Sequence, residues 1–174
     1  MAISSSEPAD PTGTPIAVYE VLDTVRAQVA AIDRLVALAR STLRVFDVDL
    51  SQGGWSRIER TAALAALLRR SRDVRVQIIV HDTRYLEASC PRLLGLLRQA
   101  SESMRIYRTG REARPAMDPL VLVDGCHFLH RFHIDQPRAA LGIEQPGLVR
   151  PLLQRFDEIW ATGEPGVGAS VLGL

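Results

Sequence analysis

Apolar residues near the start of the chain recur at steps of three and four positions, the period of a helix with one buried face. The stripe begins at residue 16 and comprises Val18, Val21, Leu22, Val25, Val29, Ile32, Leu35 and Val36. Because Ser41 and Thr42 close the pattern, we expect one amphipathic helix across this segment. Residues 43–49 (LRVFDVD) then alternate approximately between apolar and polar side chains, and this alternation predicts a strand.

The middle of the chain alternates between helical and extended patterns. Apolar residues at helical spacing predict helices over residues 58–70 and 90–100. Residues 73–80 (DVRVQIIV), which are rich in β-branched residues, predict a strand, and a further strand is predicted over residues 103–109 (SMRIYRT). The polar stretch 110–116 is predicted to be a loop.

Two apolar runs, residues 119–123 and 127–133, are separated by Asp124-Gly125. Asp-Gly between strand-like runs is typical of a tight turn in a β-hairpin. Residues 139–143 are predicted to add a short strand. This part of the chain should therefore extend the sheet with antiparallel strands.

The last predicted helix covers residues 148–160, with Pro151 in its first turn. The order helix, βαβαβ, hairpin, helix predicts an α/β fold with a mixed β-sheet flanked by helices. We expect residues 1–15 to be a disordered lead-in, residues 16–162 to be one domain, and residues 163–174 to be a flexible glycine-rich tail.

The composition is that of an ordinary globular protein, with 47% hydrophobic and 24% charged residues among 174 and a net charge of +1. No field from the whole molecule would draw it to nucleic acid or lipid. No apolar run is long enough to span a bilayer, and no secretory signal is visible, so we expect a cytoplasmic protein without a membrane partner. Cys90 and Cys126 match no metal spacing and are expected to be free thiols.

The chain contains no lysine and no asparagine, and all 21 of its basic residues are arginine. A Walker A phosphate loop requires a lysine, as do Schiff-base enzymes that use pyridoxal phosphate or aldol chemistry. These classes are excluded, and we expect no cofactor.

Three stretches are similar to one half-unit of a phospholipase-D-like fold. Residues 39–49 (ARSTLRVFDVD) resemble the end of the first helix and the first strand of that family, and residues 64–80 (LAALLRRSRDVRVQIIV) resemble its next helix and strand. Residues 119–125 (PLVLVDG), followed by 155–160 (RFDEIW), resemble the motif strand and the closing helix. The resemblance implies a phospholipase-D-like domain.

The catalytic signature of that family is His-x-Lys-x4-Asp, in which the histidine attacks phosphorus and the lysine neutralises phosphate oxygens. If Asp124 is the motif aspartate, the histidine position falls on Met117 and the lysine position on Pro119. Neither residue has the required chemistry, and no other lysine exists. The resemblance therefore implies a degenerate relative, a pseudoenzyme similar to uncharacterised bacterial domains.

Polar residues at strand ends are the candidates for a surviving ligand site. Asp49, His81, Arg84 and Asp124 could line one cleft, since α/β folds bind ligands at the carboxyl ends of strands. Asp47 and Asp49 could instead bind a cation or act as acid and base. The alternative is structural: one aspartate caps a turn while the other pairs with an arginine, and His81 is a hydrogen-bonded residue at a strand end.

His127, His130 and His133 invite a metal interpretation. On a strand, however, positions 127 and 133 lie about 20 Å apart and position 130 faces the other way. We therefore favour surface or interface histidines and predict no metal site.

Nucleophilic serine or cysteine chemistry has little support. Ser51 and Ser56 lack the G-x-S-x-G pattern of a nucleophile elbow. Cys126 and His127 are neighbours, and adjacent strand residues should point to opposite faces, so we expect no dyad.

Arginine is concentrated in two places, interleaved with Asp73, Glu102 and Glu112. The clusters are Arg69, Arg70, Arg72 and Arg75, and Arg105, Arg108, Arg111 and Arg114. Such clusters could bind phosphate, but we favour a solvated, salt-bridged surface because aromatic residues for base stacking are sparse.

Together these observations favour a non-catalytic binding or interaction module of unknown ligand, with a homodimer as one possible partner arrangement. Two alternatives stay open. One is an enzyme of different chemistry that uses Asp47, Asp49, His81 and Asp124, and the other is an arginine-mediated nucleic-acid-binding domain.

Overall fold

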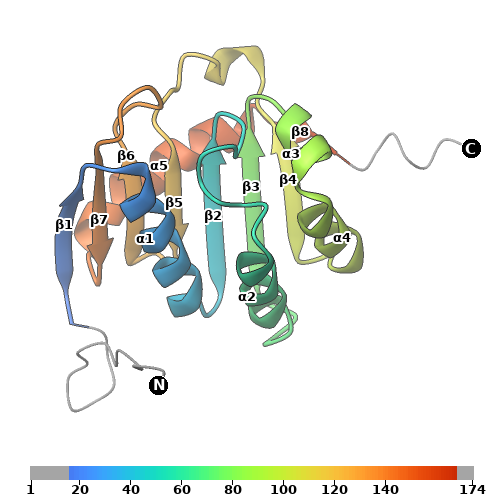
Figure 1. The fold of residues 1–174 in the computed structure, drawn as a ribbon, viewed down its shortest axis with the longest axis horizontal. Helices are drawn as coiled ribbons and strands as arrows, with labels where there is room; N and C mark the ends of the chain where they lie inside the picture. Colours follow the sequence, from blue (N-terminus) through green and yellow to red (C-terminus); the bar gives the residue numbers. More distant parts are fainter. Residues whose placement is uncertain (1–15, 168–174) are drawn as a thin grey trace, which may run out of the picture.

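Eight strands form one sheet in the order β1-β7-β6-β5-β2-β3-β4-β8 (Figure 1). The computed structural model describes residues 16–167. The strands are β1 (Val18–Leu22), β2 (Thr42–Asp47), β3 (Arg75–Val80), β4 (Met104–Arg108), β5 (Leu120–Val123), β6 (His127–Arg131), β7 (Ala139–Ile143) and β8 (Glu164–Pro165). The helices are α1 (Val25–Leu38), α2 (Ile58–Leu68), α3 (Arg84–Ser89), α4 (Pro91–Gln99) and α5 (Pro146–Ala161), with a short 3-10 turn, η1 (Arg111–Ala113). The predicted α/β class with a mixed sheet flanked by helices is confirmed.

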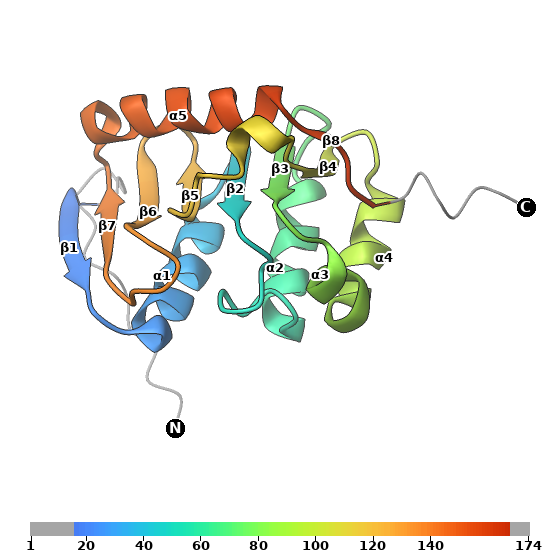
Figure 2. The same cartoon turned by 90° about the horizontal axis from the view of Figure 1, so that it is seen from above.

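Helices cover both faces of the sheet. Helices α1 to α4 pack on one face, and α5 alone crosses the other (Figure 2). Alternation along β2 supplies both layers, since Val45 joins the core under α1 and α2 whereas Phe46 joins Leu122 and Phe156 in the core under α5.

Strands β2, β3 and β4 are parallel, and each pair is connected through helices on the same face. The remaining strands run antiparallel to their neighbours. The predicted hairpin is confirmed: Val123 pairs with His127 across residues 124–126, and Asp124 and Gly125 both have positive φ values, 51° and 72°.

The prediction of a continuous helix from residue 16 is wrong at its start. Val18–Leu22 is a strand that pairs antiparallel with β7, and the helix begins only at Val25. The side chain of Thr24 caps α1 by accepting from the N–H of Ala27 over 3.1 Å. The first apolar positions fit both periods, and pairing with a strand more than 100 residues away decides between them.

Helices α5 and α3 also differ from the prediction. Helix α5 begins at Pro146, so Pro151 lies in its second turn and not in the predicted first turn. At this position the missing N–H of Pro151 removes one helical hydrogen bond. Helix α3 was not expected, since its six residues are too few to show a helical period.

Glu164–Pro165 pairs with β4, so the start of the predicted flexible tail is part of the sheet. The predicted lead-in, residues 1–15, and residues 168–174 lie outside the described residues. Between residues 16 and 167, no helix is both long and apolar enough to cross a bilayer.

Candidate functional site

The carboxyl end of β2 lies beside the beginning of β5 and the end of β6. The N–H of Arg131 donates to the carbonyl of Pro119 over 2.9 Å, and the N–H of Ile134 donates to the carbonyl of Met117 over 2.7 Å. Since β5 runs antiparallel to β2, its first residues meet Asp47, the last residue of β2. This end of the sheet therefore brings together Asp47, Met117, Pro119 and Arg131.

A cavity of about 30 Å³ lies at this end of the sheet. Its walls come from α1, β2, the loop before α2, β5 and β6: Gln28, Ile32, Phe46, Asp47, Gln52, Gly53, Trp55, Pro119, Val121, Leu129 and Arg131. One water molecule occupies roughly 10–15 Å³ on this measure. Sites for small molecules measure roughly 300–1,000 Å³, so this cavity admits water but no substrate.

The indole of Trp55 forms one wall and is only 1% exposed. Its loop is closely packed, since a Cβ on Gly53 would lie 2.3 Å from Trp55 Nε1. Among the described residues, this Nε1 is the only fully buried side-chain nitrogen or oxygen without a hydrogen-bond partner. Burying an unpaired N–H costs about 1–3 kcal/mol, so packing of the ring holds Trp55 in place against that cost.

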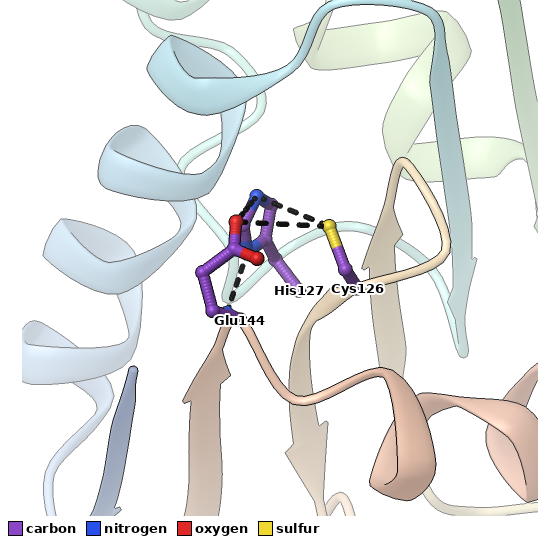
Figure 3. A group of neighbouring side chains, drawn as sticks. All are labelled: Cys126, His127 and Glu144. Atoms are coloured by element: carbon purple, nitrogen blue, oxygen red, sulfur yellow. Dashed lines mark hydrogen bonds and ion pairs between the residues drawn. The ribbon is translucent and has the colours of Figure 1, made fainter. Parts of the chain in front are cut away.

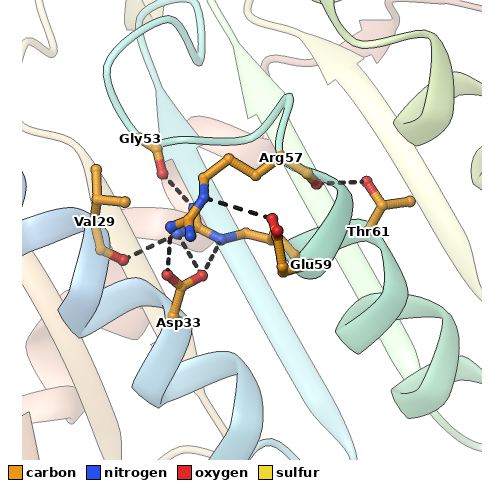
Figure 4. A network of polar contacts seen from close by, with 7 residues as sticks. Val29, Asp33, Gly53, Arg57, Glu59 and Thr61 are labelled. Carbon is orange, nitrogen blue, oxygen red and sulfur yellow. Dashed lines mark hydrogen bonds and ion pairs between the residues drawn. The ribbon is translucent and has the colours of Figure 1, made fainter.

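Arg60 packs against the ring of Trp55 and belongs to a network that joins α1, the loop and α2. Figure 4 shows its partners Val29, Asp33 and Gly53. Its guanidinium carbon lies 4.9 Å from the centre of the indole ring. It donates to Asp33 Oδ1 over 2.9 Å, to the carbonyl of Val29 over 3.0 Å, and to the carbonyl of Gly53. The side chain of Arg60 is fully buried, so these bonds fix the wall of the cavity from the interior.

Asp47 and Arg131 are the charged groups that border the cavity. Burial raises the pKa of Asp47 to about 6, although the N–H of Val48 opposes the shift by donating to its carboxylate. Arg131 donates to Gln52 Oε1 over 2.7 Å and to the carbonyl of Gln136 over 2.8 Å. Sequence reasoning did not single out Arg131, whose only signal was a cationic residue at the end of an apolar strand.

His81 does not face the cavity and is fully engaged in hydrogen bonds. Its Nδ1 lies 2.6 Å from Thr109 Oγ1, and its Nε2 lies 2.6 Å from the carbonyl of Ala116. The carbonyl can only accept, so Nε2 carries the proton and Nδ1 accepts from the threonine hydroxyl. Burial lowers the pKa of His81, and the structural interpretation of this residue holds.

The other candidates on this side of the sheet make local contacts. Asp49 follows the end of β2 and caps a turn, accepting from the N–H and the hydroxyl of Ser51 over 2.9 and 2.7 Å. Arg84 pairs with Asp82, and the side chain of Arg84 is 89% exposed. The structure thus gives Asp49 the turn-capping role that was one of its two predicted roles.

Asp124 lies at the opposite end of the sheet, so the prediction that it shares a cleft with Asp49 and His81 is wrong. Strand β5 is antiparallel to β2, which carries its last residues back to the start of β2. There Asp124 accepts from the backbone N–H groups of Arg40, Ser41 and Thr42 over 2.8–2.9 Å. Burial alone would raise its pKa, but these bonds outweigh burial and lower the pKa.

The three histidines of the hairpin differ in environment. His127 is buried, which corrects the prediction of a surface or interface residue, whereas His133 is partly exposed. His130 is half-buried and lies 3.2 Å from Asp118, which also binds Arg155 of α5. Burial alone would raise the pKa of Asp118, but the bonds from His130 and Arg155 lower it to about 2.

Cys126 and His127 do not point away from each other as expected. Cys126 Sγ lies 3.4 Å from His127 Nε2, and Glu144 completes a close group (Figure 3). Strand alternation does not apply to this pair, because β6 begins at His127 and Cys126 belongs to the turn.

The first arginine cluster borders an open groove of about 650 Å³ between the ends of α2 and α4. Arg69 and Arg72 contribute to its wall, with Ser71, Gln99 and Glu102. Within residues 16–167, Arg69, Arg70 and Arg72 form no ion pair within 4.0 Å of a carboxylate. The expected salt-bridged surface is therefore absent from this cluster in the described chain.

The model of one protein family, described as a domain of unknown function (DUF7931), matches residues 24–168. The chain belongs to this family. No curated protein matches the DUF7931 chain.

Three solved structures are similar to this DUF7931 domain. TrmBL2, described as an archaeal chromatin protein with a novel mode of DNA binding, has a TM-score of 0.65 at 11% identity, over 90% of this chain and 56% of that one. Nuc from Salmonella typhimurium, a phospholipase D family member, has a TM-score of 0.60 at 14% identity, over 87% of this chain and 99% of that one. NucT from Helicobacter pylori has a TM-score of 0.58 at 10% identity, over 86% and 99%. The DUF7931 domain therefore has a phospholipase-D-like fold.

Proposed function

We propose that this domain is a non-catalytic phospholipase-D-like module that acts by binding. The observation that carries the proposal is the cavity of about 30 Å³ beside Pro119, which has no room for a phosphodiester. Met117 and Pro119 occupy this end of the sheet, at the positions that the family motif gives to its histidine and lysine. Without the motif histidine and lysine, and without room for substrate, this site lacks what phosphoryl transfer by the family's mechanism requires.

The test is hydrolysis of a small diester, bis(p-nitrophenyl) phosphate, and of single-stranded DNA by the purified chain. We expect no turnover above that of buffer, and no difference between the chain and its His130→Gln variant. His130 is the right control because its ring contacts Asp118, an arrangement that would suit a substitute base. Turnover that disappears in His130→Gln would overturn the proposal.

A second variant tests whether the site is inactive because the cavity is closed or because the motif residues are missing. Met117→His combined with Pro119→Lys restores both residue types of the motif. If Trp55 and its neighbours close the site, the double variant stays inactive, and activity appears only when Trp55→Ala opens the wall. Activity in the double variant alone would contradict the role assigned to the closed cavity.

A second candidate function is nucleic-acid binding through the first arginine cluster. The specific observation is that Arg69, Arg70 and Arg72 have no carboxylate partner in the described chain, and that Arg69 and Arg72 border an open groove. Arginine suits phosphate recognition, since its guanidinium presents several donors in a fixed plane. The similarity to TrmBL2 shows only that the two proteins share a fold, so it does not itself support DNA binding by this chain.

Fluorescence anisotropy with a labelled DNA duplex at several salt concentrations tests this candidate. Changing Arg69, Arg70 and Arg72 together to Gln should weaken binding and reduce the salt slope by about 2–3, because each lost phosphate contact contributes roughly 0.9. The matched control changes Arg57, Arg84 and Arg108, which have carboxylate partners. Equal losses in the two triple variants would mean that total charge, and not this cluster, accounts for binding.

A homodimer is part of the first proposal. Strand β1 is an edge of the sheet, and Tyr19 and Val21 on it are exposed. Sedimentation velocity across a hundredfold range of concentration should show a monomer–dimer shift that Tyr19→Lys abolishes. A single monomeric species throughout would remove the dimer from the proposal.

A further inference from the structure

Three potential metal ligands of different chemical type lie together at the end of the sheet away from Trp55 (Figure 3). Cys126 comes from the β5–β6 turn, His127 from the first position of β6, and Glu144 from the residue after β7. The His127 Nε2 atom lies 3.4 Å from Cys126 Sγ and 3.5 Å from Glu144 Oε1, and Sγ lies 4.0 Å from Oε1. Tetrahedral bonds of about 2.0–2.3 Å would separate such atoms by about 3.3–3.6 Å. Small side-chain rotations therefore suffice to surround one ion.

The backbone holds this group in an unusual way. Glu144 has a φ of 52°, a left-handed conformation that normally favours glycine and costs other residues about 1–2 kcal/mol. Its N–H donates to His127 Nδ1 over 3.0 Å, while the next N–H, of Gln145, donates to the carbonyl of Cys126 over 2.7 Å. The chain thus tolerates strain at a glutamate whose carboxylate lies over a cysteine and a histidine.

Two carboxylates near the group attract a cation, whereas burial of Cys126 opposes the loss of its thiol proton. Burial raises the pKa of the Cys126 thiol, and the carboxylates of Glu144 and Asp124 raise it further. Burial lowers the pKa of His127, although the carboxylates of Glu144 and Asp124 act to raise it. The group therefore combines two nearby negative charges with a half-buried thiol and a neutral imidazole, and no arginine or lysine is paired with Glu144 among the described residues.

We propose that Cys126 Sγ, His127 Nε2 and a Glu144 carboxylate oxygen bind a Zn²⁺ ion. The mixed sulfur, nitrogen and oxygen donors suit zinc better than calcium or magnesium, which prefer oxygen ligands alone. Water takes the fourth position, which the partial exposure of Cys126 and Glu144 leaves accessible. The ion joins the β5–β6 turn to the end of β7.

Binding moves two protons, and one of them requires a change in the backbone. The Cys126 thiol loses its proton to buffer. The proton on His127 Nε2 moves to Nδ1, where it faces the N–H of Glu144, and two donors cannot share a hydrogen bond. Binding therefore requires the peptide between Ile143 and Glu144 to rotate so that the carbonyl of Ile143 accepts from Nδ1, and the left-handed φ of Glu144 belongs to the ion-free state.

Cobalt titration of the full chain tests the site, since Co²⁺ takes zinc positions and is visible spectroscopically. We expect one Co²⁺ per chain, with tetrahedral visible bands and a sulfur-to-cobalt charge-transfer band in the near ultraviolet, all lost on addition of one equivalent of Zn²⁺. Cys126→Ser should remove the charge-transfer band and weaken binding more than about 100-fold, beyond the 10–100-fold effect of losing an outer-shell partner. Cys90→Ser and His133→Gln, which change the same residue types elsewhere, should bind as the parent chain does.

Two further measurements keep the proposal falsifiable if a variant folds poorly. Calorimetry in buffers of different ionisation enthalpy should show release of one proton per Zn²⁺ near neutral pH. The amide resonance of Glu144 should shift on binding, as the peptide rotation requires. Absence of the charge-transfer band in the parent chain, or its persistence in Cys126→Ser, would overturn the proposal without affecting the proposed non-catalytic role of the cavity.

Discussion

Arg60 offers a direct test of how the closed end of the sheet is held. Replacing Arg60 with Met keeps much of the side-chain volume but removes its donors. The carbonyls of Val29 and Gly53 each lose a bond worth about 1–1.5 kcal/mol, and the charged bond to Asp33 adds about 1–2 kcal/mol, because Asp33 is 37% exposed and keeps Arg57. We expect the free energy of unfolding to fall by about 4 kcal/mol, within the range of about 3–5 kcal/mol for broken buried pairs.

Guanidinium unfolding at pH 7 measures this loss, and the melting temperature should fall by about 8–16 °C for a chain of this size. Arg57→Met is the matched control, since Arg57 binds the same carboxylate of Asp33 over 2.8 Å but is 45% exposed. That variant should lose less than about 1 kcal/mol. Equal losses would refute the reasoning, because they would mean that the buried acceptors add nothing to a surface ion pair.

Three further predictions concern titrating or capping groups. Burial raises the pKa of Asp47 to about 6 from 3.8, so the folded chain should lose about 3 kcal/mol of stability as the pH rises between these values. Urea unfolding at pH 7.5 should therefore show that Asp47→Asn is more stable than the parent chain by about that amount. Burial lowers the pKa of His81, so stability should fall as the pH drops below 6.5, and His81→Gln should flatten that fall in the same assay. Asp124→Ala removes an acceptor of four hydrogen bonds and should cost about 2–4 kcal/mol, whereas Asp124→Asn should cost about half as much; equal costs would contradict the capping role.

Strand direction explains the main error about the site. The pattern of residues 119–123 identifies a strand, and Asp124-Gly125 identifies a turn, and both are confirmed. Periodicity, however, is the same whichever way a strand runs. Only the pairing of β5 with β2 shows that Asp124 lies at the far end from His81.

Tertiary packing explains most of what the sequence did not reveal. Val18–Leu22 fits helix and strand alike, and its partner β7 lies late in the chain. Trp55 and Arg60 carry no motif, and their roles depend on α1, the loop and α2 meeting at one point. Asp47, by contrast, could be singled out in advance, since a carboxylate that ends an apolar strand is unusual.

Helix α5 is the only α-helix on one face of the sheet, and it follows seven of the eight strands along the chain, so this face closes only once residues 146–161 have been made. A ribosome that adds about 5–20 residues each second exposes Phe46, Leu122 and Phe128 for the time needed to complete residues 146–161 and clear the exit tunnel. Strand β1 must likewise wait for β7, which lies more than 100 residues later in the chain. Until then the nascent chain exposes apolar surface, which makes it more prone to aggregation than a protein whose core closes early.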